Sequence, residues 1–276
     1  LFRSSSGAAG TRLKSTALVP GGPFLPLALR RNLVLACFFL SGVAGLIYEI
    51  CWIKKASLVF GSTTFALSTV LAVFFAGLAL GSWIFGRVAQ RTERPLRLYG
   101  LLELGLAGAA LLSLPVVGWV DGLYGSVFRA TSGDLVQLSL VRIALVASIL
   151  LLPTFLMGGT LPLFCRQFVV KRDRIAGSVG FLYGLNTLGA VIGCAAAGFW
   201  LVPTLGVKLS VFVAVGLNLL AGAGVLLLPA APARPEETGE SATAAGAGAG
   251  DRRRRITVGV LFFLIGLIAL GTEVLW

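Results

Sequence analysis

One pattern occurs twice in this chain: RRNLVLACFFLSGVAGLIYEICW at residues 30–52 and RRITVGVLFFLIGLIALGTEVLW at residues 254–276. Ten positions are identical when the copies are aligned without gaps, including the Arg pair, the Phe-Phe-Leu triplet and the final Trp. Each copy is about as long as the roughly 20 residues that a helix needs to cross a bilayer. Each also carries one carboxylate near its end, Glu49 in the first copy and Glu273 in the second. The repeat therefore predicts two equivalent membrane helices.

The composition indicates a membrane protein over most of its length. Of the 276 residues, 57% are hydrophobic and 12% are charged, and the mean hydropathy is +0.94. A soluble domain has about 25% charged residues. The apolar runs are continuous rather than alternating, which favours helices over the strands of a membrane barrel. We therefore expect an all-α fold, a polytopic integral membrane helical bundle with seven spans: 33–53, 58–84, 96–118, 138–163, 179–203, 207–228 and 256–276.

The basic residues follow the loops between these spans. The chain has a net charge of +12, and its Lys and Arg residues gather in the amino-terminal tail and in the second, fourth and sixth loops. The alternate loops hold few, such as Lys54 and Lys55 in the first. By the positive-inside rule, the amino terminus and the even-numbered loops face the cytoplasm. This distribution favours a lipid bilayer as partner and an inner (cell) membrane location, and it argues against nucleic-acid binding.

Four regions divide the chain. Residues 1–29 form a basic tail predicted to be disordered, residues 30–228 hold six spans, residues 229–255 form a low-complexity cytoplasmic linker, and residues 256–276 form the seventh span. Six helices, a linker and a same-orientation copy of the first helix are typical of parallel-repeat transporters, notably the major facilitator type. We therefore expect one facilitator-like half and the first helix of a second, truncated half.

Charged residues inside apolar spans are the best functional candidates, because each costs several kcal/mol unless it is paired or solvated. Glu49, Glu103 and Arg142 lie within spans, and Glu273 is the repeat equivalent of Glu49. At about 1.5 Å per residue, Glu49 and Arg142 reach similar depths. We hypothesise a Glu49–Arg142 pair facing a central cavity, with an ion pair that only fixes helix packing as the alternative. For Glu103 we expect a structural role, as a protonated, water-facing or backbone-bound carboxyl group.

The fourth span contains a predicted helix break, PTFLMGGTLP at residues 153–162. Pro153, Gly158, Gly159 and Pro162 interrupt helical hydrogen bonding, which produces a kink or hinge, or else a substrate or ion site. The lone Asn186 in the fifth span is expected to pack across helices. The chain has no His, and its four Cys residues all lie in or beside apolar spans, so we expect no metal and no cofactor.

Five segments together resemble one known family. They are SGVAGLIYEICW (41–52), VFGSTTFALSTVLAVFFAGLALGSW (59–83), PLRLYGLLELG (95–105), PTFLMGGTLPL (153–163) and LYGLNTLGAVIGCAAAGFWLVPTLG (182–206). They are similar to the membrane region of spermidine-synthase-like proteins, in which a facilitator-type domain is fused to an aminopropyltransferase domain. The resemblance implies transfer of an aminopropyl group from decarboxylated S-adenosylmethionine to putrescine.

That chemistry requires a soluble Rossmann-like domain with a Gly-rich nucleotide loop and clustered acids. The sequence has 11 acidic residues and no Gly-rich loop after a strand-like run. This chain alone therefore looks non-catalytic, and we expect the enzyme domain beyond Trp276 or on a separate synthase-like partner. The first hypothesis is a membrane portion that anchors or feeds such an enzyme. The second is half of a secondary transporter for a cationic small molecule such as a polyamine.

Overall fold

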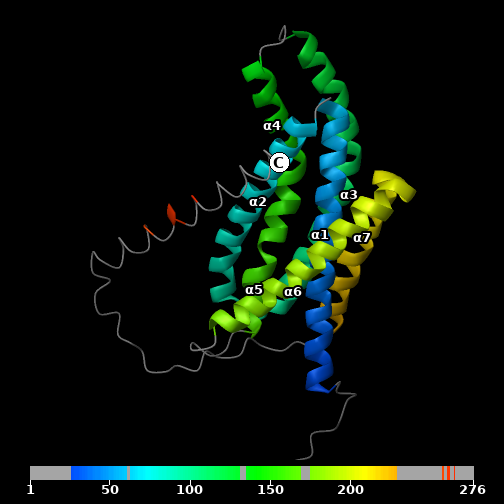
Figure 1. The fold of residues 1–276 in the computed structure, drawn as a ribbon. Helices are drawn as coiled ribbons and strands as arrows, with labels where there is room; N and C mark the ends of the chain where they lie inside the picture. The colour runs from blue at the N-terminus through cyan, green and yellow to red at the C-terminus, as the bar shows by residue number, and fades with distance from the viewer. Residues whose placement is uncertain are drawn as a thin grey trace, which may run out of the picture.

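The computed structural model describes residues 26–60, 63–130, 135–168 and 175–228, together with residues 257, 260, 261 and 264. Every regular element in this part of the chain is a helix, and no strand occurs in it (Figure 1). The elements are α1 (Leu27–Phe60), α2 (Thr63–Arg91), α3 (Pro95–Ala130), α4 (Leu135–Gly158), α5 (Thr160–Phe168), α6 (Ile175–Ala196), the π-helical turn η2 (Ala197–Leu201) and α7 (Val202–Leu227). The predicted all-α class is confirmed for these residues.

Five stretches of the described residues are long and apolar enough to cross a membrane: Ala28–Leu58, Leu67–Arg91, Pro95–Pro115, Ser139–Phe168 and Ala176–Leu227. The first four correspond to the first four predicted spans, and the fifth covers the fifth and sixth. The predicted seventh span, 256–276, lies outside the described residues except at positions 257, 260, 261 and 264, which are helical. The count of seven spans stays a prediction.

Two helices are longer than the apolar runs that predicted them. α1 begins at Leu27, within the range assigned to the tail, and continues to Phe60, so Lys54 and Lys55 lie on a helix rather than in a loop. α3 continues to Ala130 and contains Pro115. Backbone hydrogen bonding does not depend on side-chain hydropathy, so a helix can extend past the last apolar residue of its span. Hydropathy therefore predicts the apolar part of each of these helices but not the residues at which the helix begins and ends.

The chain that runs up through α6 and η2 reverses direction near the start of α7. Gly206, near the start of α7, has φ 74° and ψ 169°, a backbone conformation that side-chain-bearing residues rarely adopt. In Figure 1, α6 rises from the end of the bundle where α1 begins, and α7 returns to that end. The 52-residue stretch Ala176–Leu227 would measure about 78 Å as one straight helix, far more than the roughly 30 Å of a bilayer core. The length of this stretch and the reversal at Gly206 therefore indicate a helical hairpin.

Glycines allow the helices to pack closely. A side-chain carbon added at Gly77 or Gly81 of α2 would collide with Thr154 or with the Phe155 carbonyl group of α4. One added at Gly189 or Gly193 of α6 would collide with backbone carbonyl groups of α1. Both glycine pairs therefore lie at helix crossings, α2 with α4 and α6 with α1. Glycine faces of this kind let backbones approach closely where no water drives association.

We expect Gly81→Ala to destabilise the bundle, because the new methyl group would meet the Phe155 carbonyl group. Overpacking costs roughly 1–3 kcal/mol. Gly86→Ala on the same helix is the matched control, since nothing lies within 4 Å of the added carbon. Thermal unfolding in detergent should show a lower midpoint for Gly81→Ala and an unchanged or higher one for Gly86→Ala. Equal midpoints would contradict this account of the α2–α4 crossing.

Candidate functional site

A buried carboxyl group lies where α1, α3 and α7 meet. Glu103 of α3 has no solvent exposure, and the side-chain amide of Asn218 on α7 donates a hydrogen bond to its Oε2 at 2.6 Å. Asn218 is also completely buried, and Ser41 of α1 is 4% exposed. The sequence placed Glu103 inside a span but did not identify Asn218 as its partner.

Two hydroxyl groups complete this polar cluster, which we define as Ser41, Tyr99, Glu103 and Asn218. The hydroxyl groups of Ser41 and Tyr99 face the Glu103 carboxyl group. Tyr99 also donates a hydrogen bond to the Cys37 carbonyl oxygen at 3.2 Å, which ties α3 to α1. Among the described residues, Glu103 Oε1 and Asn218 Oδ1 have no hydrogen bond of standard geometry. The cluster therefore keeps acceptor capacity that the protein itself does not fill.

The spacing of the residues explains why they converge. Tyr99 and Glu103 are four residues apart, so they lie on one face of α3, and Cys37 and Ser41 share a face of α1 in the same way. On α7, Asn218 shares its face with Gly222. A carbon added at Gly222 would lie 2.9 Å from the Gly100 carbonyl oxygen and 3.1 Å from Glu103 Cβ. The missing side chain at Gly222 lets α7 approach α3 closely enough for Asn218 to reach the carboxyl group.

The chemistry open to this cluster is limited by its burial. A carboxyl group and an amide oxygen with free acceptor sites can bind a proton or an ammonium group. All four members of the cluster are buried, with exposed fractions of 4% or less. In this conformation the cluster bonds helices together, and a small cation reaches it only if the helices separate.

The second predicted carboxylate lies elsewhere on α1. Glu49 is buried, with 9% of its surface exposed, and Arg142 is half-buried on α4. Helices α1 and α4 are in contact. The Glu49–Arg142 pair stays a prediction, as does the role of Glu273, which lies outside the described residues.

The helix break falls at the predicted glycine pair. α4 ends at Gly158, Gly159 forms a turn, and α5 begins at Thr160, so Pro162 lies in its first turn. The Gly159 amide donates to the Leu156 carbonyl oxygen at 3.1 Å, and Thr160 Oγ1 donates to the Met157 carbonyl oxygen at 2.8 Å. These two carbonyl groups therefore have partners within the chain.

Pro153 lies inside α4, and the next residue, Thr154, donates its hydroxyl group to the Leu150 carbonyl oxygen at 2.7 Å. The contacts at the break thus favour a kink over an ion site. Hinge motion there stays a prediction.

Asn186 connects α6 to α1. Its side-chain amide donates to the Phe38 carbonyl oxygen at 3.1 Å. A carbon added at Gly42 would meet the Asn186 backbone carbonyl group, so α1 and α6 are also close at this level. Asn186 contacts another helix, and it is not among the residues that surround Glu103.

Asn218, Ser41 and Tyr99 are the site residues that sequence reasoning missed. One signal was available, since Tyr99 stands four residues before Glu103 and so shares its helix face. Asn218 is likewise the single amide side chain in the predicted span 207–228. Which helix faces which cannot be read from these patterns, because all the spans are similarly apolar.

Comparison with known proteins supports the family resemblance. The chain is 29% identical over 219 residues to Polyamine aminopropyltransferase 2 of Streptomyces coelicolor (strain ATCC BAA-471 / A3(2) / M145). The chain is homologous to a polyamine aminopropyltransferase. The match covers 75% of this chain and 37% of that relative, so the chain spans little more than a third of the relative's length. No family model and no solved structure matches the chain.

We predict that Glu103 and Asn218 are energetically coupled. Glu103→Leu or Asn218→Leu alone leaves the other polar group buried without its partner, which costs roughly 1–3 kcal/mol. The double substitution removes both groups, so its loss of stability should be smaller than the sum of the single losses. The measurement is the free energy of unfolding of all four proteins in mixed micelles.

The control pair is Asn218→Leu with Ser113→Ala. Ser113 lies ten residues along α3 from Glu103 and bonds to Trp52 Nε1 at 3.3 Å. This pair should be additive within about 0.5 kcal/mol. Additivity of the Glu103 and Asn218 substitutions would contradict the bond that defines the cluster.

Proposed function

We propose that this chain is the membrane-embedded, amino-terminal helical portion of a protein related to polyamine aminopropyltransferases. In this proposal it anchors the enzyme and does not itself transfer the aminopropyl group. The observation that carries the proposal is the homology over 219 residues, which covers 37% of a named aminopropyltransferase. In the described residues the homologous chain is helical throughout, whereas a nucleotide-binding domain of the Rossmann type needs a parallel sheet.

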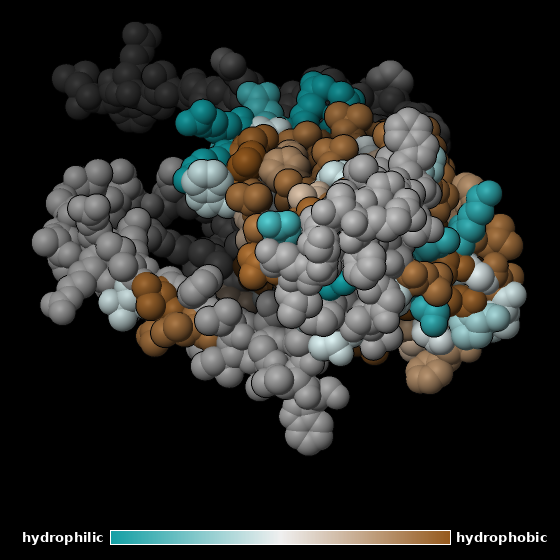
Figure 2. Space-filling model, turned by 90° about the horizontal axis from the view of Figure 1, so that it is seen from above, coloured by the Kyte–Doolittle hydropathy of each residue, from teal (hydrophilic) through white to brown (hydrophobic). Residues whose placement is uncertain are grey.

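The surface of the described helices supports membrane embedding. Large apolar side chains are exposed on all the long helices, for example Leu227 of α7 at 85% and Trp83 of α2 at 61%. Figure 2 shows hydrophobic residues in brown reaching this surface. Exposed apolar patches of this extent are unusual on soluble monomers. In a bilayer, lipid tails would cover these side chains and keep them out of water.

The positions of the basic residues support one orientation. Arg30 and Arg31 lie near the start of α1, Arg91 ends α2 and Arg166 lies on α5, and these three helix ends lie in the lower half of Figure 1. The Arg87 guanidinium carbon lies 3.8 Å from the centre of the Trp83 ring. Trp and Arg side chains together are typical of the membrane–water interface. We propose that this end faces the cytoplasm and that Ala176–Leu227 crosses the bilayer twice.

We predict that the chain is an integral membrane protein with this topology. Alkaline carbonate should leave it in the membrane fraction. Alkaline phosphatase fused after Arg91 should be inactive, whereas phosphatase fused after Lys208, near the α6–α7 reversal, should be active. Release by carbonate would contradict embedding, and the opposite activities would contradict the orientation.

We also predict that the purified chain forms no spermidine from putrescine and decarboxylated S-adenosylmethionine. An active polyamine aminopropyltransferase in the same detergent serves as the positive control. Spermidine formation by the chain alone would overturn the assignment of catalysis to another part of the protein.

A transport role for a polyamine is the alternative, favoured by the two buried carboxyl groups Glu49 and Glu103. Uptake of labelled putrescine into vesicles by the chain, lost in Glu49→Gln, would support this alternative over the anchoring role.

A further inference from the structure

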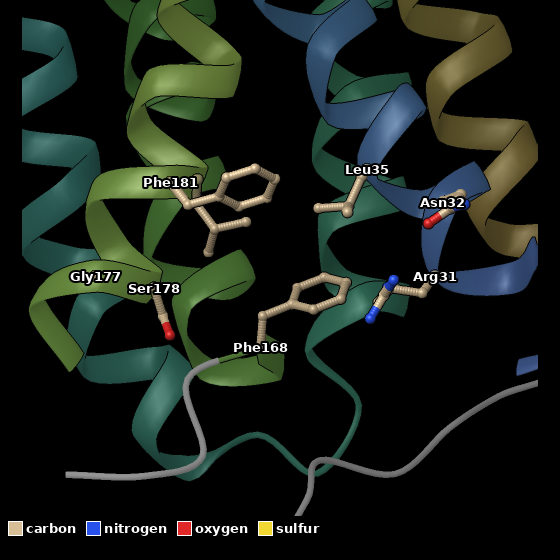
Figure 3. Close-up of a pocket in the computed structure, with 8 residues that line it drawn as sticks. Arg31, Asn32, Leu35, Phe168, Gly177, Ser178 and Phe181 are labelled. Atoms are coloured by element: carbon tan, nitrogen blue, oxygen red, sulfur yellow. The ribbon is translucent and has the colours of Figure 1, made fainter. Parts of the chain in front are cut away.

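A cleft opens between α1, α5 and α6 at the end of the bundle where α1 begins. It encloses about 750 Å³ and is lined by residues of all three helices. Figure 3 shows Leu35 and Phe181 pointing into the space between α1 and α6, and Arg31 extending toward Phe168. Pockets of about 300–1,000 Å³ are the usual size of small-molecule sites.

The lining changes from polar to apolar over one helical turn. On α1, Arg31 is followed four residues later by Leu35, and on α6, Ser178 is followed three residues later by Phe181. Residues three or four apart lie on the same helix face and about 4.5–6 Å apart along the axis. Both walls therefore have a polar residue at the helix start and an apolar residue one turn deeper.

The described part of the lining carries positive charge. Among the described residues that line the cleft, Arg31 is the single charged one, and Asn32 and Ser178 add uncharged hydrogen-bond donors. Ser178 lies in the first turn of α6, where the helix dipole also favours negative charge. Phe181 is 59% exposed, so the apolar part of the cleft is open at the side of the bundle.

We propose that this cleft binds an anionic phospholipid. The phosphate lies against Arg31, Asn32 and Ser178, and an acyl chain lies along Leu35, Phe168 and Phe181. Basic pockets between membrane helices on the cytoplasmic side bind anionic headgroups in this way. The charge complementarity and the open apolar side together select a lipid over a free anion. The inference rests on the membrane placement proposed above.

The experiment measures which lipid the chain retains. The chain is reconstituted in nanodiscs of equal phosphatidylglycerol and phosphatidylcholine, and the lipids that stay bound are identified by native mass spectrometry after release. Wild-type chain should retain phosphatidylglycerol preferentially. Arg31→Gln should lower the ratio of the two lipids about five-fold, the factor expected for one basic side chain at an anionic surface. Arg91→Gln, an exposed arginine at the same end but outside the cleft, should leave the ratio unchanged.

The following results also decide the proposal. Asn32→Asp adds a carboxylate at nearly constant size and should also lower the ratio, which gives a second test if Arg31→Gln does not purify. Millimolar inorganic phosphate should not displace the lipid, and displacement would identify a simple anion site instead. Equal retention of both lipids, or equal effects of Arg31→Gln and Arg91→Gln, would overturn the proposed lipid site and leave the membrane placement untouched. Failure of the wild-type chain to enter nanodiscs would instead contradict the membrane placement.

Discussion

Close approach of helix backbones is the constraint on which the rest of this structure depends. Gly81 sets the distance between α2 and α4, Gly193 that between α1 and α6, and Gly222 that between α3 and α7. At each of these positions a side-chain carbon would meet the neighbouring helix. Apolar side chains on the outside of the bundle cannot select these partners, because they are similar on every helix.

The polar contacts are possible because the backbones are close. Asn218 reaches Glu103 beside Gly222, and Asn186 reaches the Phe38 carbonyl oxygen where Gly42 meets α6. Hydrogen bonds of this kind choose one register among many apolar alternatives, since a slipped helix leaves a polar group without a partner. In this conformation the buried carboxyl group of Glu103 therefore serves to hold α3 and α7 in register. Its free acceptor atoms are what a transport role would need.

The sequence predicted more of the fold than of the site. Continuous apolar runs predicted the helices, and the Gly158–Gly159 pair predicted the break at which α4 ends. Helices α1 and α3 extend beyond their predicted spans, to Leu27 and Ala130, because polar residues continue a helix as readily as apolar ones do. Asn218 was missed because its contact with Glu103 joins residues 115 positions apart. Contacts between distant helices depend on which faces meet, and uniformly apolar spans give no pattern that reveals this.

Collision measurements on nitroxide labels test membrane embedding most directly, in a chain whose four cysteines are replaced by alanine. Val191 on α6 is 60% exposed and lies inside the stretch Ala176–Leu227, whereas Arg91 ends α2 at the basic end of the bundle. A label at Val191→Cys in lipid vesicles should collide with oxygen more than with a water-soluble nickel chelate. A label at Arg91→Cys should show the reverse. Preferential collision of the Val191 label with the nickel chelate would show that this face meets water and would contradict the account.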